Sequence, residues 1–258
     1  MIRFDDGAGY ERAMGLWSRP VGEVFLDWLA PPPGLRWLDV GCGNGAFTEL
    51  LMQRCAPAEA QGVDPSEAQL AFARTRPGAR GAHFRQGDAM ALPFDDDAFD
   101  AVAMALAIFF VPEPARGVAE MARVVRPGGL VATYAWDFTG GGFPWALVQE
   151  EVRAAGLTHP LPPSVGVEQL DSLRDLWSGA GLRDIETRQI TVQRHFSDLA
   201  EFWDALSGTA SLRDTLANMP PGDLARLKER VEARLRIDGS GAVTHNATAN
   251  AIKGRVPA

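Results

Sequence analysis

The chain has 258 residues, of which 46% are hydrophobic and 22% are charged. This length and composition suit one large globular domain and are not those of a disordered or fibrous protein. Lys and Arg number 25 against 33 Asp and Glu, which gives a net charge of -8 with no block of basic residues. Such a balance disfavours nucleic acid as a partner.

Residues 1–34 are predicted to form a helical cap. Hydrophobic residues recur at three- and four-residue intervals between positions 10 and 30, as in an amphipathic helix, and Pro20 is expected to interrupt it. Three prolines and Gly34 then end the helix. The short apolar run 35–40 predicts a buried strand. A glycine-rich loop and a helix over 44–55 follow it.

Strands and helices alternate through the next ninety or so residues. This alternation predicts an α/β fold with a doubly wound, Rossmann-like, mainly parallel sheet of seven strands. The turn Arg126-Pro127-Gly128-Gly129 is expected to lead into the fifth strand. The predicted elements are strands 60–63, 83–86, 99–105 and 130–136, with helices 66–75 and 115–125 between them.

The last 120 residues complete a single domain over 1–258. Two segments, 137–168 and 193–238, are predicted to be insertions that cover the substrate site. The first is rich in Gly and Pro and contains one short helix, and the second has helical periodicity that breaks at 220–222. The other predicted elements are a helix over 169–180 and strands over 182–192 and 242–256.

The segment Trp37–Ala46 joins a buried strand directly to a helix. Gly41 and Gly43 allow positive backbone φ and close approach of a ligand, while the helix N-terminus presents unpaired amides. This arrangement favours a nucleotide or a carboxylate. With Ala46 and with Asp64 further along, the glycines also satisfy the loose fingerprint of a dinucleotide site, so the loop alone leaves the ligand open.

Two further acids help to distinguish the ligands. Asp39 stands two residues before the first glycine, where a carboxylate can receive a cationic amino group. Asp88, in Gly87-Asp88-Ala89, follows the third strand and can accept a hydrogen bond from an adenine amino group. Together with Asp64, they put acids at three successive strand ends. That pattern suits a ligand with an ammonium group, a ribose and an adenine.

At this point the chain resembles the class I S-adenosylmethionine-dependent methyltransferases of the bacterial "type 11" family. The segments that carry the resemblance are LDVGCGNG, GVDPS, FRQGDAMALPFDDDAFDAV and EMARVVRPGGLVATYAWD. It extends over roughly residues 8–192. The resemblance implies S-adenosyl-L-methionine as the cofactor, S-adenosylhomocysteine as the product, and residues 35–136 as the cofactor-binding half.

The resemblance also implies which residues surround the cofactor. It puts Gly41, Cys42 and Gly43 around the methionine part, with Ala105 and Leu106 beside it. Ribose and adenine binding fall to the second and third motifs, and the opening YERAMGLWSR resembles a cap that folds over the cofactor. The remaining cofactor-binding candidates are Tyr10, Met14, Trp17, Arg19, Asp39, Asp64, Pro65, Gly87, Asp88 and Ala89.

The acceptor side is less defined by the sequence. Trp136, Phe143 and Trp145 gather at the end of the fifth strand and are candidates for a substrate wall around a small-molecule methyl acceptor. Relatives often have a histidine near Phe109, and this chain does not. Methyl transfer needs a base only if the acceptor must lose a proton, and the candidate for that role is His195.

Two other functions stay open at this level. The glycine loop with Asp64 is compatible with an NAD(P)-dependent oxidoreductase, and the missing histidine at Phe109 is compatible with a cofactor-binding regulatory protein without catalysis. No metal site is expected, because Cys42 and Cys55 lack metal-ligand spacing. Reduced cysteines, a charged N-terminus unlike a signal peptide, and the absence of a long apolar run predict a cytoplasmic protein without membrane contact.

Overall fold

The structure, a computed structural model, describes residues 14–207, 209 and 212–258. Its strands form one sheet in the order β3-β2-β1-β4-β5-β8-β6, and the short β7 pairs with β8. The first five strands are parallel, and β8 runs antiparallel to both β5 and β6. The strands are β1 (Arg36–Val40), β2 (Glu59–Asp64), β3 (His83–Gln86), β4 (Phe99–Ala105), β5 (Val125–Trp136), β6 (Arg183–Phe196), β7 (Arg236–Ile237) and β8 (Val243–Arg255).

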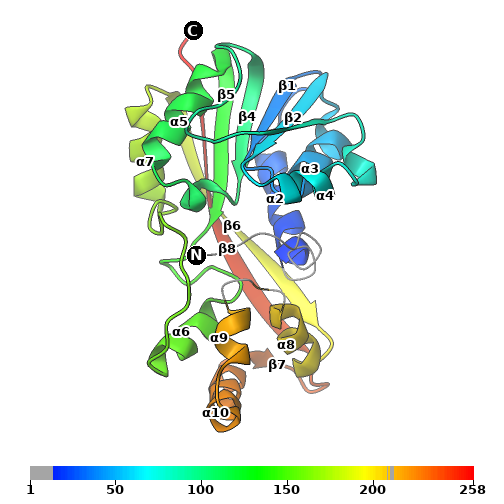
Figure 1. Cartoon of the computed structure of the whole chain (residues 1–258), viewed down its shortest axis with the longest axis vertical. Coiled ribbons are helices and arrows are strands. Elements are labelled where there is room, and N and C mark those ends of the chain that lie inside the picture. The colour runs from blue at the N-terminus through cyan, green and yellow to red at the C-terminus, as the bar shows by residue number, and fades with distance from the viewer. Residues whose placement is uncertain (1–13, 208, 210–211) are drawn as a thin grey trace.

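The predicted doubly wound α/β fold is therefore confirmed, with β7 as an additional strand that the sequence did not indicate. Helices cover both faces of the sheet (Figure 1). Trp28 of α2 and Trp177 of α7 lie against Lys253 and Gly254, which are adjacent residues on opposite faces of β8. Helices α2 (Leu16–Leu29), α3 (Ala46–Cys55) and α4 (Glu67–Ala73) cover one face, and α5 (Pro114–Arg123) and α7 (Leu170–Gly179) the other.

The parallel strands form the core of this layered arrangement. Ala101, Val102 and Ala103 of β4 have no exposed surface, because β4 lies between two other strands and under helices on both faces. A strand covered in this way has to be apolar along most of its length. In the described part of the chain, no helix is both long enough and apolar enough to cross a membrane.

Strands β6 and β8 extend beyond the sheet as a two-stranded ribbon. Strand β5 pairs with β8 only as far as Trp136, which lies opposite Ala249, whereas β6 continues beside β8 to Phe196, opposite Val243. Figure 1 shows this ribbon running down to a separate helical lobe. The lobe contains α6 (Ala146–Ala154), α8 (Leu199–Ser207), α9 (Arg213–Ala217), α10 (Pro221–Glu232) and β7.

Three local predictions were wrong. Helix α2 continues through Pro20, which is only its fifth residue and so removes few intrahelical bonds. Strand β5 already begins at Val125, and residues 126–129 are looped out between the pairs Phe99–Val125 and Ala101–Leu130. Residues 193–196 belong to β6 and not to the helical insertion, because their alternating exposure suits a strand with one covered face.

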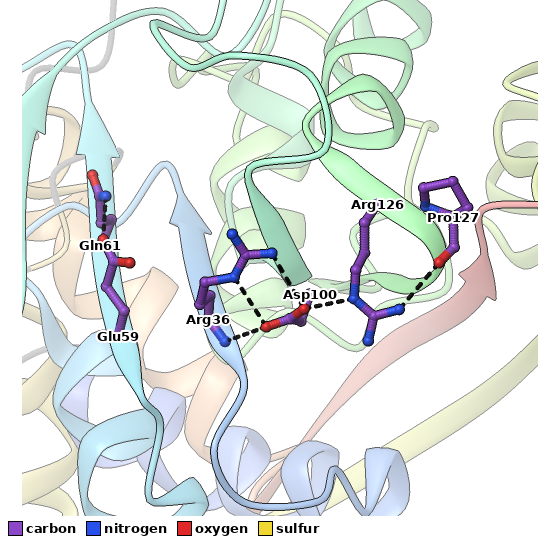
Figure 2. Close-up of polar contacts among 6 residues, drawn as sticks. All are labelled: Arg36, Glu59, Gln61, Asp100, Arg126 and Pro127. Carbon is purple, nitrogen blue, oxygen red and sulfur yellow. Dashed lines mark hydrogen bonds and ion pairs between the residues drawn. The ribbon is translucent and has the colours of Figure 1, made fainter.

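At the amino edge of the sheet, Asp100 ties three neighbouring strands together (Figure 2). Its Oδ2 accepts from the Arg36 amide at 2.8 Å and from Arg36 Nε at 3.3 Å, and its Oδ1 accepts from Arg126 Nε at 2.6 Å. Burial raises the pKa of Asp100, but these hydrogen bonds and charges outweigh burial and hold the pKa at about 2.

Asp100→Asn is expected to lower the free energy of unfolding by about 1–2 kcal/mol at pH 7, because the charged hydrogen bonds to two guanidinium groups are lost. The depressed pKa of Asp100 means that this stabilisation is present above the unfolded value of 3.8 and disappears as the pH falls towards 2. Urea unfolding at pH 7 and pH 3 measures it. Equal differences between variant and wild type at both pH values would contradict the assignment.

Candidate functional site

A cavity of about 470 Å³ opens at the carboxyl ends of the parallel strands. It lies where the strand order changes direction between β1 and β4, which is where ligands bind in open α/β sheets. The lining comes from α2, from the β1–α3 loop and α3, from the ends of β2 to β5, and from η3 (Ile108–Phe110). Its volume is that of a pocket for one nucleoside-sized ligand.

The glycine loop forms the floor of this cavity. Gly41, Gly43 and Gly45 all have positive φ, at 69°, 50° and 79°. A Cβ at Gly41 would lie 2.6 Å from the Cβ of Ala107, whereas one at Gly43 would meet nothing closer than an atom of Gln69 at 3.9 Å. The loop therefore needs glycine at position 41 for packing, and the face at Gly43 is left open on the cavity side.

Asp39, at the end of β1, has no exposed surface although it lines the cavity. Its Oδ2 accepts a 2.6 Å hydrogen bond from Thr48 Oγ1, and its buried Oδ1 has no hydrogen-bond partner. Burial raises the pKa of Asp39 to about 7; the Thr48 hydrogen bond lowers it, and the charge of Asp64 raises it further. An unpaired buried carboxylate oxygen beside a cavity is a receptor for a cationic or hydrogen-donating group.

Asp64 fixes the glycine loop to the next turn. Its Oδ2 accepts from the Gly43 amide at 2.9 Å and its Oδ1 from the Ser66 amide at 2.8 Å. Burial raises the pKa of Asp64, and the two amides oppose that rise. Each carboxylate oxygen keeps a second lone pair, so Asp64 can still accept from ligand hydroxyls. Cys42 belongs to the loop and is buried; burial raises the pKa of its thiol, as do the charges of Asp39 and Asp64.

The third acid, Asp88, lines the cavity from the turn after β3. Asp88 is exposed and its Oδ1 accepts from the Met90 amide at 2.8 Å, which holds the turn after β3. Gly87 is packed so closely that an added Cβ would lie 2.7 Å from Val63. Ala89 and Met90 add apolar surface to the lining. This turn can therefore offer a carboxylate and an apolar face to a planar ring.

The wall formed by the end of β4 and the residues after it is mostly apolar. Leu106 follows β4 in the left-handed conformation, with φ at 55°, and donates its amide to the Tyr134 carbonyl at 2.8 Å. A branched residue in this region is strained, and such strain gathers at functional sites. No pattern in the sequence predicts this strain at Leu106. The other apolar side chains of this wall are those of Met104, Ala105, Phe110, Val111 and Pro112.

Two features of the site had little signal in the sequence. Glu49 and Arg76 form an ion pair at 2.9 Å with both side chains largely buried, and Arg76 Nε also donates to the carbonyl of Asn44 in the glycine loop. Their separation of 27 residues hides this pairing. Thr48, the partner of Asp39, was visible only as a lone polar residue on an apolar helix face.

The structure brings together most of the predicted cofactor residues. The cavity lining includes Arg19, Asp39, Gly41, Cys42, Gly43, Asp64, Pro65, Gly87, Asp88, Ala89, Ala105 and Leu106. Met14 and Trp17 lie in the hydrophobic core and not in this lining, and Tyr10 falls outside the described residues. Among the described residues, no group of three or more His, Cys, Asp or Glu side chains is arranged to hold a metal ion.

The acceptor-side candidates lie elsewhere. Trp136, Phe143 and Trp145 are buried in the core; Trp145 packs edge-on against Trp17 with ring centroids 6.3 Å apart. None of these three aromatic side chains is part of the cavity lining. His195 is exposed on β6, with Nδ1 3.0 Å from Thr244 Oγ1, and it does not line the cavity either.

The chain is similar in sequence to known methyltransferases. Residues 38–133 match the family described as "Methyltransferase domain". The chain is 40% identical over 128 residues to a malonyl-(acyl-carrier protein) O-methyltransferase of Methylococcus capsulatus, which covers 48% of this chain and 46% of that protein. It is 39% identical over 111 residues to a ubiquinone/menaquinone biosynthesis C-methyltransferase of Dinoroseobacter shibae, covering 42% and 44%.

A solved structure extends the likeness in fold. Phosphoethanolamine N-methyltransferase 2 of Haemonchus contortus, in complex with S-adenosyl-L-methionine, superposes with a TM-score of 0.61 at 18% identity, covering 99% of this chain and 58% of that one. The chain spans about half the length of the curated relatives it matches. The matched segment contains the glycine loop, Asp39, Asp64 and Asp88. Residues 38–133 thus match a methyltransferase domain, and the fold of the chain is similar to that of a methyltransferase solved with S-adenosyl-L-methionine bound.

Proposed function

We propose that the protein transfers the methyl group of S-adenosylmethionine to a small-molecule acceptor by in-line displacement. The observation that carries this proposal is the unpaired Oδ1 of Asp39, buried at the glycine loop beside the cavity. This oxygen has no partner in the protein, and an ammonium group of a ligand would supply one. S-Adenosylmethionine carries such a group. A nicotinamide dinucleotide would bring pyrophosphate to the same loop, where the carboxylate of Asp64 would repel it.

Three parts of the cavity would hold the cofactor. Asp39 would receive the ammonium group, and the open face of Gly43 would let the methionine part lie against the backbone. The second lone pairs of Asp64 would accept from the ribose hydroxyls. Asp88 would accept from the adenine amino group while Ala89 and Met90 pack on the ring.

When bound, S-adenosylmethionine supplies a methyl group on a positively charged sulfur, which is a good leaving group. The protein then has two tasks, to hold the acceptor in line and to exclude water. The apolar wall of Met104, Leu106 and Phe110 serves the second task. A base is required only for an acceptor that must lose a proton, and His195 does not approach the cavity.

The acceptor itself is proposed only as a class. The names of the similar proteins include O-, C- and N-methyltransferases, so likeness to them does not select an acceptor atom. The helical lobe formed by parts of 137–168 and 193–238 lies on the side of the carboxyl edge of the parallel strands (Figure 1). We propose that an acceptor enters between this lobe and the cavity.

The test combines binding and turnover. Thermal melting with S-adenosylhomocysteine, with NADH and with buffer alone is expected to show a higher midpoint with S-adenosylhomocysteine only, because a ligand that binds the folded state stabilises it. Transfer of labelled methyl from S-adenosylmethionine to a panel of small acceptors then separates an enzyme from a regulatory protein. A midpoint raised only by NADH would reject the proposal.

Asp64→Ala is expected to weaken S-adenosylhomocysteine binding by about 1–3 kcal/mol, because the carboxylate no longer accepts from the ribose and no longer fixes the glycine loop through Gly43. It should also lower the free energy of unfolding by about 1–2 kcal/mol, since the part-buried amides of Gly43 and Ser66 lose their charged acceptor. Calorimetric titration and urea unfolding measure the two effects. Unchanged affinity would remove Asp64 from the site.

Asp88→Ala is expected to have a smaller effect, of about 1 kcal/mol on binding, because the side chain is exposed and competes with water for the adenine. The loss should be equal for S-adenosylhomocysteine and for adenosine, since both carry the adenine. Titration of the two ligands against variant and wild type checks this. A loss confined to S-adenosylhomocysteine would move Asp88 away from the adenine.

A further inference from the structure

The environment of Asp39 leads to an inference that rests on the proposed function and goes beyond it. The carboxyl group has no exposed surface, and Thr48 donates to Oδ2 only. Its Oδ1 is buried without a partner, and a lone charged oxygen in that position is costly. A proton on Oδ1 removes that charge and leaves the Thr48 hydrogen bond intact. The geometry alone therefore favours a neutral carboxyl in the ligand-free protein.

In the chain as the structure describes it, no neighbouring positive charge compensates the negative charge that Asp39 would have when ionised. On the neighbouring strands, Gly62 and Ala103 lie directly opposite and bring no charge. Asp64 is an acid, and its negative charge opposes ionisation of Asp39. Arg76, the buried cation of the cavity lining, is paired with Glu49. The ionisable side chains that share the cavity with Asp39 are Arg19, Cys42, Glu49, Asp64, Arg76, Asp88 and Tyr134.

The other groups near Asp39 have partners of their own. Both oxygens of Asp64 accept backbone amides, and Glu49 accepts from Arg76 and from the Gly78 amide. Arg19 pairs with Glu23 at 3.2 Å. The thiol of Cys42 has a pKa well above its usual value and stays neutral. Among the described residues that line the cavity, Asp39 is thus the acid with a buried oxygen that has no hydrogen-bond partner. Its raised pKa, about 7, is what such burial produces.

We propose that Asp39 couples cofactor binding to the release of a proton and thereby selects ligands that carry an ammonium group. In the ligand-free site Oδ1 carries a proton. When an ammonium group binds against Oδ1, the O–H bond breaks, the proton leaves to solvent, and the resulting carboxylate pairs with the ammonium group while Oδ2 keeps its bond from Thr48. A ligand without that ammonium group leaves the proton in place and gains nothing from Asp39.

The test is calorimetric titration of S-adenosylhomocysteine in buffers with different ionisation enthalpies, from pH 6 to pH 8.5. Wild type is expected to release close to one proton per ligand at pH 6 and close to none at pH 8.5, with affinity rising about tenfold per pH unit below pH 7. 5′-Methylthioadenosine, which lacks the amino-acid part, should bind without proton release. Asp39→Asn should abolish the release, and Asp100→Asn, at the opposite edge of the sheet, should preserve it.

Thr48→Val separates this role from a structural one. It removes the hydrogen bond that favours the ionised carboxylate, so the proton should stay on Asp39 to higher pH and its release should persist at pH 8.5. This arm remains decisive if Asp39→Asn binds too weakly or folds poorly. Binding of S-adenosylhomocysteine without proton exchange at any pH would overturn the coupling alone. Failure of a folded protein to bind it at all would overturn the proposed function as well.

Discussion

The stability of the wild-type protein relative to Asp39→Asn is expected to fall by about 2–3 kcal/mol between pH 5 and pH 8. The pKa of Asp39 is about 7 in the fold against 3.8 unfolded. Because the folded value is higher, the stability that comes from the protonated form is complete below pH 3.8 and is lost as the pH rises to about 7. Asn cannot ionise, so the variant lacks this loss.

The measurement is urea unfolding of both ligand-free proteins at several pH values. For a chain of this length the effect corresponds to about 5–10 °C in melting temperature. The quantity to follow is the difference in unfolding free energy between the two proteins as the pH changes. The cost of burying an amide in place of a carboxyl is the same at every pH and cancels from this change. Asp100→Asn is the matched control, since its pH dependence lies on the acid side and has the opposite sign. Parallel pH profiles for wild type and Asp39→Asn would show that Asp39 titrates normally.

Gly41→Ala is expected to lower the free energy of unfolding by about 2–4 kcal/mol and to weaken S-adenosylhomocysteine binding by at least about a hundredfold. Alanine at a φ of 69° costs about 1 kcal/mol, and its Cβ would lie 2.6 Å from Ala107, which adds the cost of overpacking. Relief requires the loop to move away from β4. Such a movement displaces the backbone on which the cofactor lies.

Gly34→Ala provides the control for backbone strain alone. Gly34 has a φ of 81°, but a Cβ there would have no neighbour within 4 Å, and it does not line the cavity. It should therefore cost about 1 kcal/mol of stability and leave binding unchanged. Urea unfolding and calorimetric titration of both variants compare them. Equal stability losses for Gly41→Ala and Gly34→Ala would show that the contact with Ala107 is easily relieved.

The sequence predicted the strands and the glycine loop well because their signals are local. The apolar runs ending at Val40 and Ala105 mark strands covered on both faces, and the glycines after Val40 mark a turn that other residues enter with strain. The end of β6 was missed because Arg194 and His195 interrupt the apolar pattern while the pairing with β8 continues. Pairing with a strand that is distant along the chain does not produce a pattern in the nearby sequence.

The sequence predicted which residues belong to the site better than it predicted their burial and their contacts. Asp39 was identified as an acid near the loop, but its complete burial and its hydrogen bond from Thr48 depend on how α3 packs on β1. Trp136 and Trp145 stand near the carboxyl edge in sequence, yet their side chains enter the core. The packing of the neighbouring elements decides whether a bulky aromatic residue at such an edge faces the core or the cavity.

The ribbon of β6 and β8 has a consequence for how such a protein can change over evolutionary time. The lobe is joined to the sheet by this ribbon and by the packing of Trp145, at the start of α6, on Trp17, and no residue of α6, α8, α9 or α10 lines the cavity. The O- and C-methyltransferase relatives each match less than half of this chain, and the segment that matches a methyltransferase domain ends at residue 133, before the lobe begins. Mutations can therefore accumulate in the lobe without altering the glycine loop. The ribbon lets selection reshape one end of the molecule while the chemistry at the other end is inherited intact.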